Sequence, residues 1–331
     1  MRRRIVGLPA LVLALAVLCG CVMPWQSVVR EDAVITVSDA EVGADLYALY
    51  LSQIFRTPQK FGLADTSRDA AEKKAVELCT QYVAINTAFR DAGLRLTPEY
   101  KTRIAENVSV KWSFYRKFYE SVGVRKQTLT KYETAEAKRE LMIASKYGKG
   151  GSAAVSDVEL DAYYAVNYVT FRSVNGYLTR TGADGKTERL PKAELAAIED
   201  RFRRMCDDVR TGSSLEAVVK ENADSANVLS SEAQTVTINR KTSNYPAEFF
   251  SRVQQMNEGE PRVIETEDYI FLVVKQSAKE DENLQAHRLS CLLEMCAEPF
   301  GRDLAAVTAN YKVRKNTSAL GDIYGTVSKA F

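Results

Sequence analysis

The chain has 331 residues, of which 27% are charged and 46% are hydrophobic, a balance typical of a globular protein. Its 45 Lys and Arg residues against 43 Asp and Glu residues leave no basic surplus for binding nucleic acid. A single histidine, His287, and the absence of a Cys-x-x-Cys pair argue against a metal site, and the sequence has no Gly-x-Ser-x-Gly motif of a hydrolase. We expect no cofactor.

The first residues have the pattern of a secretory signal peptide. Arg2, Arg3 and Arg4 are followed by an apolar stretch, Leu8–Val17, that only Pro9 interrupts. A transmembrane helix needs about 20 apolar residues, so this stretch is short for one. The pattern predicts a signal peptide over residues 1–20, and its removal takes three of the 45 basic residues, which leaves 42 against 43.

The end of this stretch carries a sharper signal. Leu18-Cys19-Gly20-Cys21 resembles a lipobox, in which the cysteine thiol receives a diacylglycerol before cleavage ahead of it. The interpretation is a lipid anchor on Cys21, followed by a tether over residues 21–32, that holds the protein on the extracytoplasmic face of a cell membrane. The alternatives are an ordinary signal cleaved nearby and an anchor that is not cleaved.

A helical domain is predicted over residues 33–154. It begins with a short strand at Ala33–Val37, and Ser38-Asp39-Ala40-Glu41 is interpreted as a capping box that opens a first helix. Apolar residues at helical spacing and breaks at Gly93 and Gly123 predict three more helices. These are expected at about 68–91, from Thr97-Pro98 to just before residue 123, and at about 129–147.

A flexible, glycine-rich linker is predicted at residues 148–154, and the chain changes character after residue 170. Ser156-Asp157-Val158-Glu159 repeats the Ser-x-x-Glu pattern and is interpreted as a second capping box, which opens a connecting helix over 155–170. The order β-α-α-β-α-β-β that follows predicts a small α+β domain with an antiparallel sheet over 171–278. Its helices are predicted at 192–210, 215–222 and 246–256, and its strands at 171–181, 235–238, 263–266 and 269–275. A helix at about 282–310 and a strand at 311–313 are predicted in the C-terminal segment, 279–331.

Four segments follow one another in the order and spacing of a known set of motifs. Val155–Tyr164 looks like a helix that precedes a parvulin unit, and Thr211–Glu221 is similar to "G-x-x-F-x-x-L-A-K". Tyr245–Phe250 matches "Y-P-x-E-F", and residues 257–266 match "G-E-x-S-x-V-x-E-T". The chain therefore resembles the extracytoplasmic foldases of the SurA and PrsA type, lipoproteins among them, with a degenerate parvulin-like (PpiC-type) peptidyl-prolyl isomerase domain.

The resemblance implies an α+β fold, with a helical SurA-N-like chaperone domain and an inserted parvulin-like domain. It also implies that the C-terminal helix and strand pack back on the helical domain, where the first and last strands can pair. The partners it implies are unfolded or newly exported polypeptides and the membrane, with no nucleic acid and no small-molecule substrate.

The sequence departs from the parvulin pattern at the site of catalysis. Val174–Leu178 stands where parvulins have a histidine in "H-I-L", no histidine lies near residues 269–270, and Ser230–Gln234 replaces "G-G-D-L-G". No catalytic residue is assigned. The resemblance implies that a proline pocket would be lined by residues at five candidate positions: Asn175, Ser225, Phe249, Met256 and Ile270.

Three functions remain open. Prolyl isomerisation requires no covalent chemistry, only a pocket that binds the twisted amide better than its planar forms across a barrier of about 18–20 kcal/mol. Because the missing histidines order that pocket in parvulins, weak or absent turnover is expected. The favoured hypothesis is a membrane-anchored chaperone or foldase for unfolded exported chains. The alternatives are an active prolyl isomerase and a scaffold or assembly lipoprotein of the cell envelope.

Overall fold

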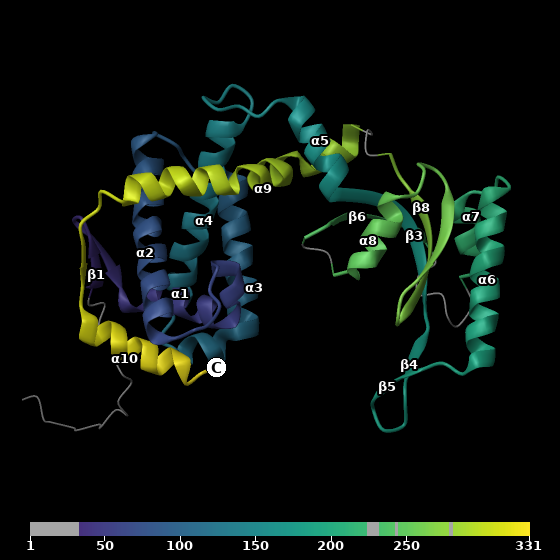
Figure 1. The fold of residues 1–331 in the computed structure, drawn as a ribbon, viewed down its shortest axis with the longest axis horizontal. Coiled ribbons are helices and arrows are strands. Elements are labelled where there is room, and N and C mark those ends of the chain that lie inside the picture. Colours follow the sequence, from purple (N-terminus) through teal and green to yellow (C-terminus); the bar gives the residue numbers. More distant parts are fainter. Residues whose placement is uncertain (1–32, 224–231, 242–243, 278–280) are drawn as a thin grey trace, which may run out of the picture. The chain divides into compact units, whose positions relative to one another are not determined.

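The computed structural model describes residues 33–223, 232–241, 244–277 and 281–331 (Figure 1). In this part of the chain, helices and antiparallel sheets form an α+β fold, which confirms the predicted fold class. The predicted signal peptide, Cys21 and the tether lie outside the described residues, as does Ser225. No described helix is both long enough and apolar enough to cross a membrane.

The fold has two compact units that alternate along the sequence. Of the described residues, the first contains 33–79, Tyr115–Thr128 and Val313–Phe331, and the second contains those within Thr80–Phe114 and Leu129–Lys312.

The first unit is built on a small antiparallel sheet of order β2-β1-β9. Strand β1 (Ala33–Val37) pairs with β2 (Ala40–Gly43) and with β9 (Val313–Lys315), so the first and last strands do pair as expected. The capping box interpreted at residues 38–41 is wrong, because Ser38, with φ 52°, lies in the turn of the β1–β2 hairpin. The backbone of residues 40–43 pairs with β1, and helix α1 begins only at Ala44.

Helices pack around this sheet in the first unit. They are α1 (Ala44–Arg56), the short 3₁₀ helix η1 (Pro58–Phe61), parts of α2 (Arg68–Asp91) and α3 (Pro98–Ser121), and α10 (Thr317–Ser328). In the first turn of α1, the buried Asp45 carboxylate accepts hydrogen bonds from Thr128 Oγ1 at 2.6 Å and from the Leu46 amide at 2.8 Å. The sequence did not predict α10, which the Asn316 side chain caps by accepting from the Ala319 amide.

Tyr47 in α1 gives a prediction about stability. Its side chain is fully buried, and its hydroxyl has no hydrogen-bond partner among the described residues. An unsatisfied buried polar group costs about 1–3 kcal/mol. Tyr47→Phe should therefore raise the free energy of unfolding by about 1 kcal/mol, measured by urea denaturation. The matched control is Tyr164→Phe, which should lower it, because the Tyr164 hydroxyl bonds Thr170 Oγ1 at 2.8 Å. A loss of stability in Tyr47→Phe would contradict the assignment.

The helices of the second unit bury an apolar cluster against one another. They include the remaining part of α2, α4 (Lys126–Tyr147), α5 (Asp157–Asn167) and α9 (Asp281–Thr308), and the remaining part of α3 also belongs to this unit. Ser156 accepts from the Glu159 amide and Glu159 accepts from the Ser156 amide, so the second predicted capping box is confirmed. The cluster includes Ile85, Ile143, Tyr164, Leu292 and Phe300.

The second unit also contains a four-stranded antiparallel sheet of order β6-β3-β8-β7. Its strands are β3 (Tyr168–Tyr177), β6 (Gln234–Asn239), β7 (Pro261–Glu265) and β8 (Tyr269–Lys275). Helices α6 (Lys192–Arg210) and α7 (Leu215–Glu221) cover one face, and α8 (Ala247–Gln254) covers the other (Figure 1). A small hairpin, β4 (Thr179–Thr181) with β5 (Thr187–Arg189), follows β3.

Candidate functional site

The α8 face of the four-stranded sheet carries the candidate site. Side chains alternate between the faces of a strand, and directly opposite residues of paired strands share a face. Asn175 of β3 is opposite Phe271 of β8, and Tyr177 is opposite Tyr269. These four residues therefore point to the side of the sheet on which α8 lies.

Aromatic rings form a continuous row on this face. The Tyr245 ring stacks on Phe249 with centroids 4.7 Å apart and lies 5.7 Å from Phe271. Tyr269 lies 5.9 Å from Phe271 and 5.2 Å from Tyr177. Beside this row is a cavity of about 410 Å³, which we call the aromatic groove. It is lined by Asn175, Asn244, Tyr245, Pro246, Thr266, Glu267, Asp268, Tyr269 and Phe271.

The groove has an apolar floor and an acidic end. Phe249 is fully buried and Phe271 is nearly so, whereas Tyr245 and Tyr269 are half-buried with ring surface at the groove. Burial raises the pKa of the Tyr245 hydroxyl, which is therefore neutral at physiological pH. The carboxylates of Glu267 and Asp268 are exposed in the turn between β7 and β8, and no Lys or Arg is among the lining residues. The groove is therefore suited to an apolar segment that carries positive charge nearby.

A second cavity, of about 380 Å³, shares Asn244 and Tyr245 with the groove. At its wall, Glu294 of α9 accepts hydrogen bonds from the hydroxyls of Tyr168 at 2.7 Å and Tyr163 at 3.0 Å, and from the Asn239 side chain. Burial and the Glu294 carboxylate raise the pKa of Tyr163 to about 12. These bonds join α9 to α5, β3 and β6, so the carboxylate serves mainly to hold the elements together.

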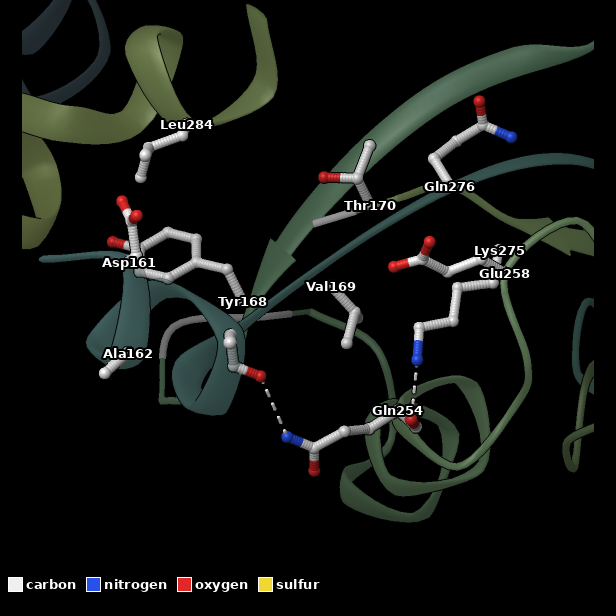
Figure 2. A pocket seen from close by; sticks show the side chains of 11 residues that line it. Asp161, Ala162, Tyr168, Val169, Thr170, Gln254, Glu258, Lys275, Gln276 and Leu284 are labelled. Carbon is white, nitrogen blue, oxygen red and sulfur yellow. Dashed lines mark hydrogen bonds between the residues drawn. The ribbon is translucent and has the colours of Figure 1, made fainter. Parts of the chain in front are cut away.

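A larger cavity, of about 630 Å³, lies where α5 ends and β3 begins (Figure 2). The Gln254 side chain donates to the Val166 carbonyl at 3.0 Å, and the Lys275 ammonium donates to the Gln254 carbonyl at 2.7 Å and to the Met256 carbonyl at 2.9 Å. The Val166 and Gln254 carbonyls belong to the last turns of α5 and α8, which need such donors, and Met256 follows α8. These bonds occupy the side chains of Gln254 and Lys275, which thereby hold α5, α8 and β8 together.

The structure brings only some of the predicted pocket positions together. Asn175 lines the aromatic groove, and Phe249 and Met256 lie beneath it in one core cluster. Ile270 is fully buried on the opposite face of the sheet, where it packs in the cluster of Val174 and Phe202. The reason is the period of two along β8, which turns Phe271 rather than Ile270 towards α8.

The sequence reasoning missed Tyr245, Tyr269 and Phe271 as lining residues. Tyr245 stood within the matched "Y-P-x-E-F" motif, next to Phe249, which was chosen instead. Tyr269 and Phe271 alternate along the predicted strand, so the signal for one shared face was present. Only the register with β3 shows that this face is the one that carries Asn175.

His287, the one histidine of the sequence, lies on α9 and does not line the groove. Its imidazole is half-buried, with its ring 5.7 Å from Tyr168 and 6.1 Å from Tyr164. Burial lowers its pKa below the ordinary value of 6.5.

The lowered pKa of His287 predicts a pH dependence of stability. Below pH 6.5 the unfolded chain binds this proton more readily than the folded chain does, so stability should fall from that pH down to the folded pKa. Urea denaturation at a series of pH values should show a smaller loss in His287→Gln than in the unchanged protein. Identical pH profiles of the two proteins would contradict the prediction.

Among known proteins, the chain is similar to a set of solved structures. No protein-family model matches the chain, and no curated protein matches it. A structure of foldase protein PrsA from Streptococcus pneumoniae is 14% identical, with a TM-score of 0.38, over 75% of this chain and 88% of that one. A PrsA foldase from Lactococcus lactis is also 14% identical, with a TM-score of 0.38, over 89% and 99%. PrsA from Bacillus subtilis is 11% identical, with a TM-score of 0.30, over 90% and 92%.

The chain is similar to PrsA foldases. This is the kind of protein that the sequence motifs resemble. Because the PrsA structures share 14% identity or less with the chain and have TM-scores of at most 0.38, the likeness supplies no site residues. The function is therefore argued from the aromatic groove itself.

Proposed function

We propose that the protein is an extracytoplasmic chaperone or foldase, anchored to the membrane by a lipid on Cys21, that binds segments of unfolded exported polypeptides. The observation that supports this most is the aromatic groove. Half-buried rings from two separate segments, Tyr245 and Tyr269, offer apolar surface beside a cavity of about 410 Å³. Aromatic side chains gain binding energy from apolar partners at low entropic cost, which suits the capture of varied segments.

The groove supports binding better than catalysis. Its neutral polar side chains are Asn175, Asn244 and Thr266, and its carboxylates lie at one end. Since the single histidine of the sequence does not line it, the groove has no histidine pair with which to order a twisted prolyl amide. We therefore propose that the parvulin-like domain serves as a peptide-binding module with weak or no isomerase activity.

The lipid anchor adds to this role. A tether that begins at Cys21 keeps the protein at the membrane surface, where exported chains emerge unfolded. The effective concentration of weak binding sites is then high without any further contact. Cys21→Ser should abolish incorporation of labelled fatty acid and release the protein from washed membranes. A labelled, membrane-retained Cys21→Ser protein would overturn the assignment of the anchor.

Suppression of aggregation tests the chaperone function. Added at about the molar concentration of a chemically denatured client, the protein should reduce light scattering on dilution. Tyr245→Ala should weaken this effect, and Val307→Ala should not, because Val307 is an exposed apolar residue of α9 outside the groove. No suppression at any ratio would reject the proposal.

Two measurements address the other functions. In a protease-coupled assay with a proline peptide, the protein should leave the rate at its uncatalysed value, and a clear acceleration would establish an active isomerase. Capture of one stable partner from the envelope, together with no binding of unfolded chains, would instead support a scaffold lipoprotein.

A further inference from the structure

The first unit carries a second group of aromatic side chains, far from the sheet of the groove in sequence. The Phe331 ring stacks on Phe55 with centroids 5.6 Å apart and meets Phe118 edge-on at 5.3 Å. The Arg56 guanidinium lies 4.7 Å from the centre of the Tyr115 ring and 5.7 Å from that of Phe118. We call these five residues the aromatic–basic patch. The patch joins the end of α1, the last turns of α3 and the end of the chain after α10 (Figure 1).

The patch is exposed although it is rich in apolar atoms. Phe331 is 55% exposed and Tyr115 is 43% exposed. Behind the rings, Tyr324 fixes α10 by donating from its hydroxyl to the Thr66 carbonyl at 3.0 Å. Phe55 is half-buried against the Tyr324 ring at 5.6 Å, and Phe118 is half-buried as well. The patch is therefore a contiguous, partly exposed apolar surface, and such surfaces mark interaction sites.

The charge beside the patch is positive. Arg56 itself is exposed, and exposed Lys60 and Lys329 lie four residues after Arg56 and two residues before Phe331. Among the ion pairs of the described residues, none occupies Arg56, Lys60 or Lys329, whereas Arg116 pairs with Glu120 at 2.8 Å. Aromatic rings flanked by basic side chains are the combination that settles at the interface of an anionic bilayer.

The proposed lipid anchor places a membrane within reach of the patch. Cys21 and Ala33 are twelve positions apart in the sequence, and such a segment spans at most about 40 Å when fully extended. Ala33 pairs with Gly43, immediately before the 13-residue helix α1, and Arg56 ends that helix. A helix of this length spans about 20 Å. The patch is therefore nearer to the start of β1 than the length of the extended tether, about 40 Å.

We propose that the aromatic–basic patch docks on the headgroup region of the anionic membrane to which Cys21 anchors the protein. This contact rests on the lipid anchor of the proposed function but not on peptide binding in the aromatic groove. It would orient the first unit on the membrane, with the Phe331 ring at the lipid interface.

Fluorescence quenching by the bilayer tests the proposal. Full-length lipidated protein carrying Phe331→Trp is reconstituted in vesicles of brominated phosphatidylcholine, with or without phosphatidylglycerol. The unsubstituted protein gives the background of Trp25 and Trp112, and Tyr177→Trp is the matched control, since Tyr177 is an exposed aromatic residue of the second unit. The F331W protein should be quenched above background in vesicles with phosphatidylglycerol, and the Y177W protein should not.

A change of charge supplies a second measurement with the same tryptophan reporter. Reversal by Arg56→Glu in the F331W protein should reduce docking by about five-fold or more, since each cation near an anionic surface contributes that factor. High salt should also reduce quenching, because the Debye length falls from about 10 Å at 0.1 M to about 3 Å at 1 M.

Two results would overturn the proposal. One is quenching of the F331W protein no greater than background in anionic vesicles. The other is an unquenched F331W protein in which Arg56→Glu abolishes suppression of aggregation, because the patch would then bind unfolded clients rather than lipid. Since the groove variants test the proposed function separately, failure here leaves that function standing.

Discussion

Phe249→Ala is expected to lower the free energy of unfolding by about 3–5 kcal/mol, which is the usual cost of a large aromatic truncation in a core. The side chain is fully buried, and its ring lies 5.5 Å from Phe171 and 4.9 Å from Phe271. Its removal leaves a cavity between α8 and the sheet, in addition to the lost transfer energy. Thermal and urea denaturation measure the effect.

The size of this loss decides what Phe249 does. Phe249→Leu should cost clearly less than alanine, and Tyr177→Ala should cost little because Tyr177 is 42% exposed. If Phe249→Ala instead left stability within about 1 kcal/mol while it removed peptide binding, the residue would be a wall of the ligand site and not part of the core.

Combined truncation of Tyr245 and Tyr269 is expected to weaken binding of an unfolded apolar peptide by about 10- to 100-fold, since buried aromatic contacts at binding sites commonly contribute more than 1 kcal/mol each. Both side chains line the aromatic groove and are half-buried, so their loss should affect stability less than that of Phe249. Fluorescence anisotropy of a labelled peptide measures the affinity. Tyr245→Phe keeps the ring and is the matched control.

The acidic end of the groove adds a preference among peptides. A peptide with lysines beside its apolar residues should bind more tightly than one with glutamates, and the difference should shrink in high salt. The double change Glu267→Gln and Asp268→Asn should remove most of the difference. Equal affinity for both peptides in the unchanged protein at low salt would show that these carboxylates do not act on the bound segment.

The sequence predicted most helices because each has capping or helix-breaking residues at its own ends. The prediction of α2 at 68–91 and of α6 at 192–210 agrees with the structure, as does the start of α3 at Pro98. The two Ser-x-x-Glu segments show that the same local pattern can form different structures. Ser156 caps a helix, whereas Ser38 turns a hairpin, because pairing with β1 satisfies the backbone after it. That pairing depends on the tertiary structure, so it cannot be predicted from a short segment alone.

Helix α10 was missed for a related reason. It contains Gly321 and Gly325, and each interior glycine costs a helix about 1 kcal/mol relative to alanine. Packing on α1 stabilises it all the same. A Cβ at Gly321 would overlap the Arg68 guanidinium, which is the end of a long, half-exposed side chain and can move aside.

The candidate site was predicted only in part. The motif around Phe249 identified the right helix, and Asn175 the right face of β3. Ile270 was chosen in place of Phe271, one residue away, because a shift of one position in a strand moves a side chain to the other face. Register is set by the partner strand and by the turn at residues 267–268, so it had to come from the structure.

The pairing of β1 with β9 has a consequence for the timing of folding. Ile35 is opposite Lys315, so the first strand of the described chain completes its sheet with a segment that is made much later. Such distant contacts slow folding, since the intervening chain must be ordered before they form. When the chain is synthesised from its N-terminus, the first unit therefore cannot close before Val313–Lys315 is available. Pulse-labelling hydrogen exchange should show β1 among the last segments to become protected.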